Sequence, residues 1–124
     1  MNGKSMFGAF FKERRLALGV SLRTFCLDNG LDPGNLSKLE RGLLPPPQGR
    51  EKLEQYARLL KIKEGSDEWY EFFDRAAAEA GRLPADLASD EEVLKKVPVL
   101  FRTLRGKNVT EEELDKLIEL IRKA

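Results

Sequence analysis

The sequence contains no histidine, and cysteine occurs once, at Cys26. Without histidine, a histidine acid–base pair, a serine–histidine triad and most zinc sites are excluded. A single cysteine cannot form a disulfide within the chain, so we expect Cys26 to be a small core residue. The sequence also lacks a glycine-rich phosphate loop. We therefore expect no enzymatic activity, no catalytic residue, no metal and no cofactor.

No apolar run approaches the ~18 residues that a membrane-spanning helix needs. The N-terminal segment MNGKSMFGAFFKERR also lacks the apolar stretch and the cleavage site of a signal peptide. We expect a chain without a membrane partner, located in a reducing cytoplasm. Its 124 residues, 41% hydrophobic and 35% charged, are typical of one soluble domain with a small appended segment.

The net charge of +1 is distributed unevenly along the chain. Residues 1–63 carry twelve Lys/Arg and six Asp/Glu, a net charge of +6, whereas residues 64–124 carry ten and fifteen, a net charge of −5. A basic N-terminal half favours a polyanionic partner for that half alone. The alternative interpretation is a chance scatter of solvated surface charge.

No strand-like alternation of useful length occurs, and apolar residues recur at helical spacing, so we predict an all-α fold. The segment LLPPPQG, residues 43–49, is expected to be a loop because consecutive prolines exclude helix. The sequence RLPA, residues 82–85, is expected to be a turn. The expected helices cover about residues 5–18, 21–29, 32–42, 49–61, 66–80, 90–96 and 98–105, and a last helix starts at Thr110 with a capping box to Glu113.

Two short helices separated by a tight turn are predicted within SLRTFCLDNGLDPGNLSKLERG, residues 21–42. Ser21 is a good N-cap, and the pair Asn29-Gly30 tolerates the left-handed conformation of a helix C-terminus. Asp32 followed by Pro33 is typical of a second helix start. Such a pair forms a helix-turn-helix, whose second helix can lie in the major groove of DNA.

The segment FFKERRLALGVSLRTFC, the turn, and NLSKLERG followed by a proline loop and an apolar helix resemble the XRE family of helix-turn-helix regulators. That family contains the lambda repressor and Cro. The resemblance extends over residues 7–60. It implies a lambda-repressor-like, five-helix DNA-binding domain over residues 1–81 and a C-terminal helical extension over residues 82–124. It also implies double-stranded DNA as the partner.

The resemblance assigns residues 32–42 as the recognition helix and, position by position, implies a set of DNA contacts. A buried ion pair between Arg15 and Glu40 is implied as well and would fix the angle of that helix. Among side chains of these types, Asn can pair with adenine and Lys with guanine. Arg50 and Lys52 are weaker candidates for phosphate contact. The implied DNA-contacting residues are Ser21, Arg23, Pro33, Gly34, Asn35, Ser37, Lys38 and Arg41.

Three features depart from the family pattern. Asn29 stands where an apolar core residue is usual, which predicts an early end to the second helix. Pro33 and Gly34 replace polar side chains at the tip of the recognition helix, and two acids cancel two bases along it. We therefore expect readout to depend on Asn35, Lys38 and the shape of the DNA.

One helix-turn-helix contacts a short half-site, so we expect a homodimer on a partly palindromic operator. The alternative for the C-terminal apolar stripe is that it packs on the chain's own core. The predicted function is a sequence-specific transcriptional regulator that acts as a repressor. The candidate dimer residues lie in the helix over 66–80 and in the last helix: Trp69, Tyr70, Phe73, Leu114, Leu117, Ile118 and Ile121.

Two other functions fit the same residues. One is an antitoxin resembling the HigA-like group, which would neutralise a basic toxin through its acidic C-terminal half and regulate its own operon. The other is an interaction module that uses the same fold without binding DNA.

Overall fold

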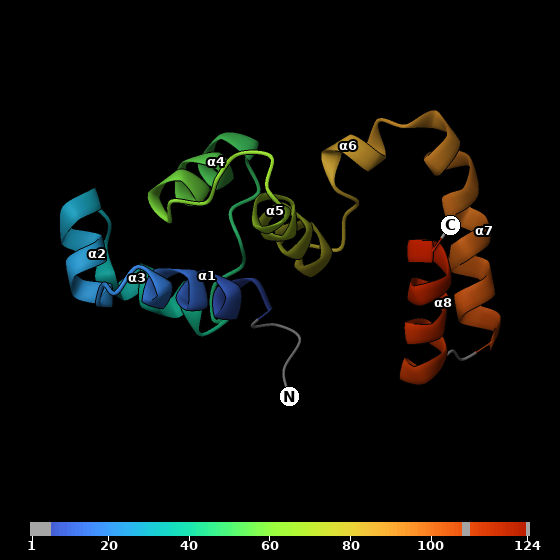
Figure 1. Cartoon of the computed structure of the whole chain (residues 1–124), viewed down its shortest axis with the longest axis horizontal. Coiled ribbons are helices and arrows are strands. Elements are labelled where there is room, and N and C mark those ends of the chain that lie inside the picture. The colour runs from blue at the N-terminus through green and yellow to red at the C-terminus, as the bar shows by residue number, and fades with distance from the viewer. Residues whose placement is uncertain (1–5, 108–109, 124) are drawn as a thin grey trace. The chain divides into compact units, whose positions relative to one another are not determined.

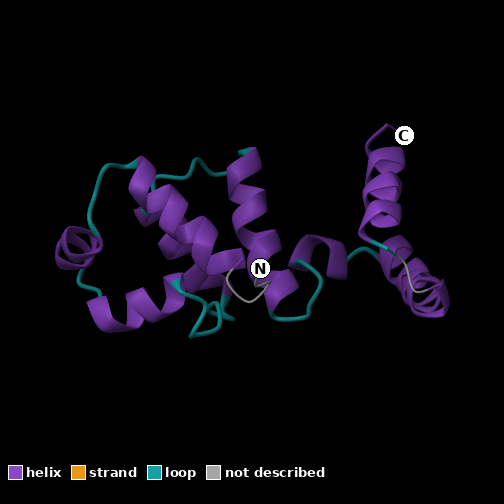
Figure 2. Cartoon of the chain, turned by 90° about the horizontal axis from the view of Figure 1, so that it is seen from below, coloured by secondary structure: helices purple, strands orange, loops and turns teal. Residues whose placement is uncertain are grey.

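The computed structural model of the chain describes residues 6–107 and 110–123, and these residues form helices and loops without a strand (Figures 1 and 2). The prediction of an all-α fold is confirmed. Ser5, the expected start of the first helix, lies outside the described residues. None of the described helices is both long enough and apolar enough to cross a membrane. The helices are α1 (Met6–Ala17), α2 (Leu22–Asn29), α3 (Pro33–Glu40), α4 (Arg50–Leu59), α5 (Asp67–Glu79), α6 (Ala85–Ala88), α7 (Glu91–Lys107) and α8 (Glu111–Lys123).

The chain divides into two compact units. Unit 1, Met1–Pro84, contains α1 to α5, and unit 2, Ala85–Ala124, contains α6 to α8. The boundary expected from the sequence, between residues 81 and 82, lies three residues earlier.

The core of unit 1 is formed by one face of each of its five helices. Helix α1 contacts α3 and α5, α2 contacts α3, and α4 contacts α5. Fifteen of the described apolar residues are buried, and all of them belong to this unit. The fully buried rings of Phe7 and Phe72 have centroids 4.9 Å apart, and the Phe7 backbone N–H donates to the Glu79 carboxylate at 3.0 Å. Burial of each large side chain contributes roughly 1.5–3 kcal/mol, so aromatic packing between α1 and α5 stabilises the unit.

The apolar faces of α1 to α5 are largely buried, with two exceptions at helix ends. Leu18 continues the apolar spacing of α1 but is 38% exposed, because α1 ends at Ala17 and the chain then leaves the helical phase. Ala80 is also exposed, since it is the C-cap of α5 and lies beyond the buried face.

Helices α1 and α3 approach each other closely at Gly8. A Cβ atom at this position would overlap the carbonyl oxygen of Leu39 and lie 2.8 Å from that of Glu40. Any side chain at residue 8 would therefore displace α3. The absence of a side chain here sets the separation of the two helices.

The prediction of two short helices over residues 90–96 and 98–105 is wrong. Helix α7 is continuous from Glu91 to Lys107 and contains Pro98. A proline within a helix removes one backbone hydrogen bond, here the one to the carbonyl of Leu94, and favours a kink. Asp90 caps this helix, because its side chain accepts from the Glu92 N–H at 2.9 Å.

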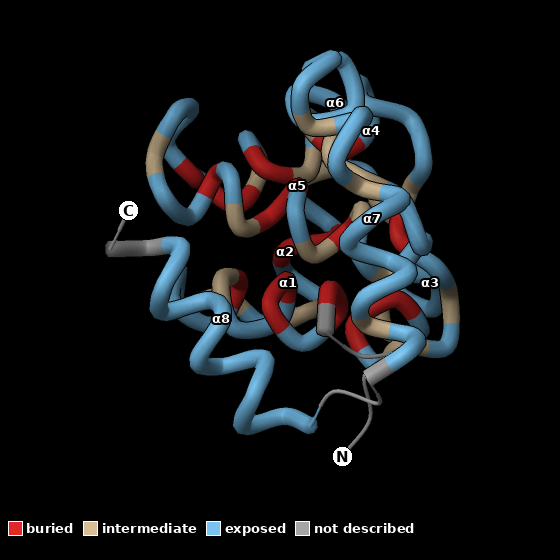
Figure 3. The backbone as a smooth tube through the Cα atoms, turned by 90° about the vertical axis from the view of Figure 1, so that its right-hand side faces the viewer, coloured by how far each residue is buried: buried red, intermediate tan, exposed pale blue. Residues whose placement is uncertain are grey.

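Unit 2 has a different character from unit 1. Its first helix, α6, was not predicted, and it begins directly after Pro84, where a turn was expected. Helix α8 has the predicted capping box, because Glu113 accepts from the Thr110 N–H at 3.0 Å and Thr110 accepts from the Glu113 N–H at 3.2 Å. None of the described residues of this unit is buried (Figure 3).

Candidate nucleic-acid interface

Helices α2 and α3 are joined by the three residues Gly30–Asp32. Ser21 caps α2 by accepting from the Thr24 N–H at 3.1 Å. Gly30 ends α2 in the left-handed region, with φ 66°, where a side chain would be strained. Asn29 remains within α2, since its side-chain amide donates to the Phe25 carbonyl at 2.8 Å. Helix α2 ends at Asn29, the last residue of the helix expected from the sequence.

Three apolar residues pack around the turn between these helices. Cys26 and Leu36 are buried, and Leu31 is half-buried against the core. Burial raises the pKa of the Cys26 thiol, because the thiolate would be poorly solvated there. Cys26 is thus a core residue, as predicted.

The start of α3 is closed by Asp32. Its carboxylate accepts from the Asn35 N–H at 2.9 Å, and Pro33, the first helical residue, has no N–H to donate. The free amides of the first turn of a helix can bind a phosphate. Because the Asn35 N–H already donates to Asp32 and Pro33 has no N–H, the Gly34 N–H is the amide that remains for such a contact in this turn.

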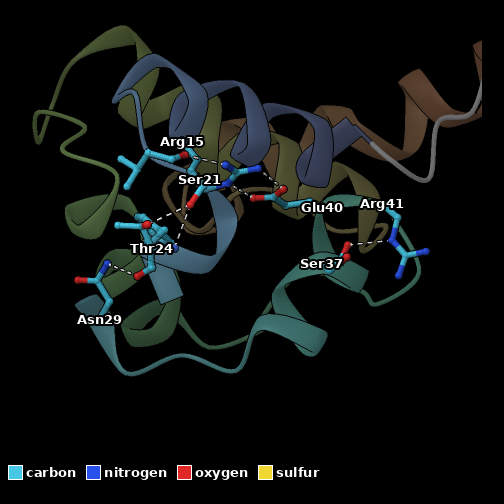
Figure 4. Close-up of polar contacts among 9 residues, drawn as sticks. Arg15, Ser21, Thr24, Asn29, Ser37, Glu40 and Arg41 are labelled. Carbon is cyan, nitrogen blue, oxygen red and sulfur yellow. Dashed lines mark hydrogen bonds and ion pairs between the residues drawn. The ribbon is translucent and has the colours of Figure 1, made fainter. Parts of the chain in front are cut away.

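The other end of α3 is anchored to α1 by a buried ion pair (Figure 4). Arg15 Nε lies 2.7 Å from Glu40 Oε2, and Arg15 Nη2 lies 2.9 Å from Glu40 Oε1, so the pair is bidentate. Arg15 Nη1 also donates to the Val20 carbonyl at 2.8 Å. The hydrogen bonds to Glu40 raise the pKa of Arg15 above its usual value, although burial opposes them. This geometry fixes α3 relative to α1 and to the loop that precedes α2.

The exposed side of α3 carries three of the eight predicted contact residues. At about 100° per residue, Gly34, Lys38 and Arg41 lie opposite the buried residues Leu36 and Leu39. All three are exposed. The guanidinium of Arg41 donates through Nε to the backbone carbonyl of residue 37 at 3.3 Å and projects from the end of the helix (Figure 4).

The remaining predicted contacts are placed at the margins of this surface. Pro33 and Asn35 are exposed, whereas Ser37 is half-buried. On α2, Ser21 and Arg23 are exposed, but the Ser21 hydroxyl is engaged with the first turn of its own helix.

The net charge of this surface differs from the sequence count. Two acids cancel two bases between residues 32 and 42, yet Glu40 is 7% exposed and is neutralised by Arg15. Asp32 is exposed at the start of the helix, where its carboxylate caps the first turn. Beyond that cap, the charges that α3 presents along its exposed side are those of Lys38 and Arg41.

A cleft of about 320 Å³ lies beside α3, between the turn, the proline loop and α4. Asn35 borders this cleft together with Lys52 and Tyr56. Lys52 lies over the Tyr56 ring, 5.1 Å from its centroid, and Arg50 lies 4.0 Å from the centroid of Phe73. Burial raises the pKa of Tyr56. The two weaker phosphate candidates, Arg50 and Lys52, are thus engaged with aromatic rings of their own unit.

The candidate dimer residues separate into two groups. Trp69 and Phe73 are 3% and 7% exposed and belong to the core of unit 1, whereas Tyr70 is 52% exposed. The candidates on α8, Leu114, Leu117, Ile118 and Ile121, are all exposed.

Two features that position this surface were missed in the sequence. Gly8 sets the separation of α1 and α3, and its signal is a residue without a side chain within the aromatic run FGAFF. The Val20 carbonyl also accepts a hydrogen bond from Arg15, and a sequence does not indicate which backbone carbonyl will accept such a bond.

Comparisons of this chain with protein-family models, with curated proteins and with solved structures find no match. Within the part of the chain that the structure describes, no group of metal-ligating side chains is found either.

Proposed function

We propose that the chain is a sequence-specific, DNA-binding transcriptional regulator of the XRE type, with α2 and α3 as its helix-turn-helix. In this proposal α3 enters the major groove, and a homodimer occupies a partly palindromic operator and represses transcription from it.

The observation that carries the proposal is a rigid helix with an uncovered polar side. Helix α3 is held at its start by Asp32 and at its end by the Arg15–Glu40 pair, and Lys38 remains exposed between them. A side chain on a fixed helix can be positioned against a base edge at little further entropic cost. Burial of Glu40 also removes a negative charge that would repel phosphates.

The exposed residues divide into two roles. Lys38 lies at the middle of the exposed side and is proposed to donate to guanine O6 and N7. Arg41 and Arg23, at the end of α3 and near the start of α2, are proposed to contact phosphates and so to set the register. Asn35 borders the cleft at the margin of the surface and is proposed to reach an adjacent adenine.

Selection of bound duplexes from a random-sequence library tests this proposal. The wild-type chain is expected to enrich a two-fold symmetric site. Lys38→Ala is expected to weaken the preference for one base at one position of each half-site. The expected loss of binding free energy is about 1–3 kcal/mol per half-site. Arg41→Ala is expected to weaken binding to all DNA sequences nearly alike. It is also expected to lower the slope of log affinity against log salt by the amount that corresponds to about one phosphate contact.

Lys63→Ala is the matched control, because Lys63 is exposed on the loop between α4 and α5. It removes the same charge and is expected to leave base preference unchanged. Absence of any enriched sequence at low salt would contradict the proposal. An unchanged preference in Lys38→Ala would remove Lys38 from base readout.

A further inference from the structure

Unit 2 is helical without a core of its own. Its 40 residues include no buried residue among those that the structure describes, and α6 and α7 are its main contacting helices. A segment of this size cannot remain folded without burying apolar surface. The apolar faces of α7 and α8 therefore require another surface.

Helix α7 carries an apolar stripe at heptad spacing. Val93, Val97, Leu100 and Leu104 alternate at intervals of four and three residues, which is the spacing of a and d positions. Phe101, which is 50% exposed, widens this stripe on one side.

Helix α8 repeats the pattern. Leu114, Leu117 and Ile121 follow the same spacing, and Ile118 widens the stripe in the same way. A stripe of a, d and e positions is wider than a two-stranded seam and is typical of helices that pack against two neighbours in a bundle. The two helices diverge in the view of Figure 3, and Leu100, Phe101, Ile118 and Ile121 of the two stripes are 44–66% exposed.

The charges of the two helices are complementary. Residues 95–105 of α7 contain four Lys/Arg and no acid, whereas residues 111–119 of α8 contain five Asp/Glu and one Lys. Lys96 and Arg105 border the stripe of α7, and Glu111 and Asp115 border that of α8.

We propose that a second copy of the chain covers this face, with α7 of each copy packed against α8 of the other in a two-fold bundle of four helices. The proposal deepens the proposed function and rests on its homodimer, for which it names the surface. A partner of one charge sign would match one helix and repel the other, whereas a second copy satisfies both.

The area available fits such a dimer. Six apolar residues on the two stripes are 37–66% exposed. Together they offer on the order of 500 Å² per copy, and the half-buried Val93, Val97 and Leu104 with the charged residues that border the stripes add toward the roughly 800 Å² that each partner contributes to an interface of standard size. Tyr70 on α5, the exposed member of the other group of candidate dimer residues, is a single ring whose apolar neighbours are buried.

The mass of the full-length chain in solution, measured without DNA by light scattering, tests the proposal. The wild-type chain is expected to have the mass of two copies, and Ile118→Lys with Ile121→Lys is expected to have the mass of one, 14.1 kDa. Both positions are exposed and lysine is a good helix former, so this variant is expected to keep its secondary structure. Val99→Lys is the matched control, because Val99 is 58% exposed on α7 but lies off the stripe, and it is expected to remain dimeric.

Charge reversal tests which helices meet. Lys96→Glu with Arg105→Glu makes the charges named beside both stripes acidic, and Glu111→Lys with Asp115→Lys makes them basic beside both. Each variant alone is expected to dimerise about tenfold more weakly, and an equimolar mixture is expected to recover the wild-type mass as a heterodimer. A mixture that stays as weak as its components would overturn the pairing of α7 with α8.

The outcomes separate this inference from the proposed function. A wild-type chain that is monomeric at all concentrations overturns the inference, even if that monomer binds another protein or anionic lipid vesicles. If the monomer binds a DNA half-site, the proposed DNA recognition still holds. A dimer that is insensitive to the α8 double variant also overturns it. A dimer that dissociates as expected but selects no duplex supports the inference and contradicts the proposed function alone.

Discussion

At the scale of single residues, the buried pair of Arg15 and Glu40 has two consequences. Its bidentate geometry orients α3, and its burial takes a carboxylate away from the surface that α3 presents. Such a pair contributes little net stability, because the desolvation of both charges offsets their attraction. Removal of one partner, however, leaves the other charge buried alone.

We expect Glu40→Gln to lower the free energy of unfolding by about 3 kcal/mol, because the Arg15 guanidinium would remain buried without a counter-charge. Arg15→Met combined with Glu40→Leu is expected to be neutral or stabilising, since no buried charge is left. Urea denaturation measures both. Glu54→Gln is the control: it breaks the exposed pair with Arg50 at 3.1 Å and is expected to cost less than about 1 kcal/mol. Equal losses of unfolding free energy in Glu40→Gln and Glu54→Gln would contradict this account.

At the scale of elements, the fold depends on how closely α1 approaches α3. Gly8 is the point of closest contact, and the rest of α3 is held by its caps and by the ion pair. The orientation of the proposed recognition helix is therefore set by backbone contacts with α1 as much as by side chains.

Gly8→Ala is expected to destabilise unit 1 by about 1–3 kcal/mol, because the new methyl group would force α3 away from α1. Gly34→Ala is the matched control within α3. A Cβ atom there would meet only Asp32 Oδ2 at 3.4 Å, an ordinary contact, so we expect a gain of up to about 1 kcal/mol from reduced freedom of the unfolded chain. Thermal unfolding compares the two, and stabilisation by Gly8→Ala would contradict the close packing of α1 and α3.

Replacement of Pro98 tests how far this proline limits the helical stability of α7. Replacement by alanine restores an N–H that can donate to the Leu94 carbonyl and relieves the ring's clash with the preceding turn. We expect Pro98→Ala to increase the helical circular dichroism signal and to stabilise α7 by up to about 3 kcal/mol. A loss of helical signal would contradict this account of Pro98.

At the scale of the whole molecule, the two units differ in what stabilises them. Among the residues that the structure describes, all fifteen buried apolar ones belong to unit 1, whereas those of unit 2 are exposed or half-buried. The units differ only slightly in net charge, which is +2 for residues 1–84 and −1 for residues 85–124, because the acidic residues of α5 offset much of the basic excess of residues 1–63.

A chain that ends at Pro84 is therefore expected to retain the unfolding free energy of unit 1 to within about 1 kcal/mol, because it keeps the entire core. Trp69 is the only tryptophan and is buried in unit 1, so its fluorescence reports on that unit alone. The shortened chain is expected to bind a single half-site as well as the full chain does but to lose affinity for the two-fold site. Loss of cooperative unfolding in the shortened chain would show that unit 2 supports the core.

Local signals predicted much of this protein. The caps at Ser21 and Thr110, the turn at Gly30 and the buried periodicity of α1 to α5 depend on residues within a few positions of one another, so the sequence is sufficient to place them. The resemblance to a known family further implied the pairing of Arg15 with Glu40, although they lie 25 residues apart.

Other properties depend on distant segments and were decided only by the tertiary structure. Trp69 and Phe73 follow the same helical periodicity whether they face a core or a partner, and packing against α1 and α4 makes them core. Pro98 is a helix breaker by local propensity, yet α7 continues through it. The surface charge of α3 depends on Glu40, whose carboxylate is neutralised only because folding brings Arg15 beside it, and no count of charges along the chain contains that information.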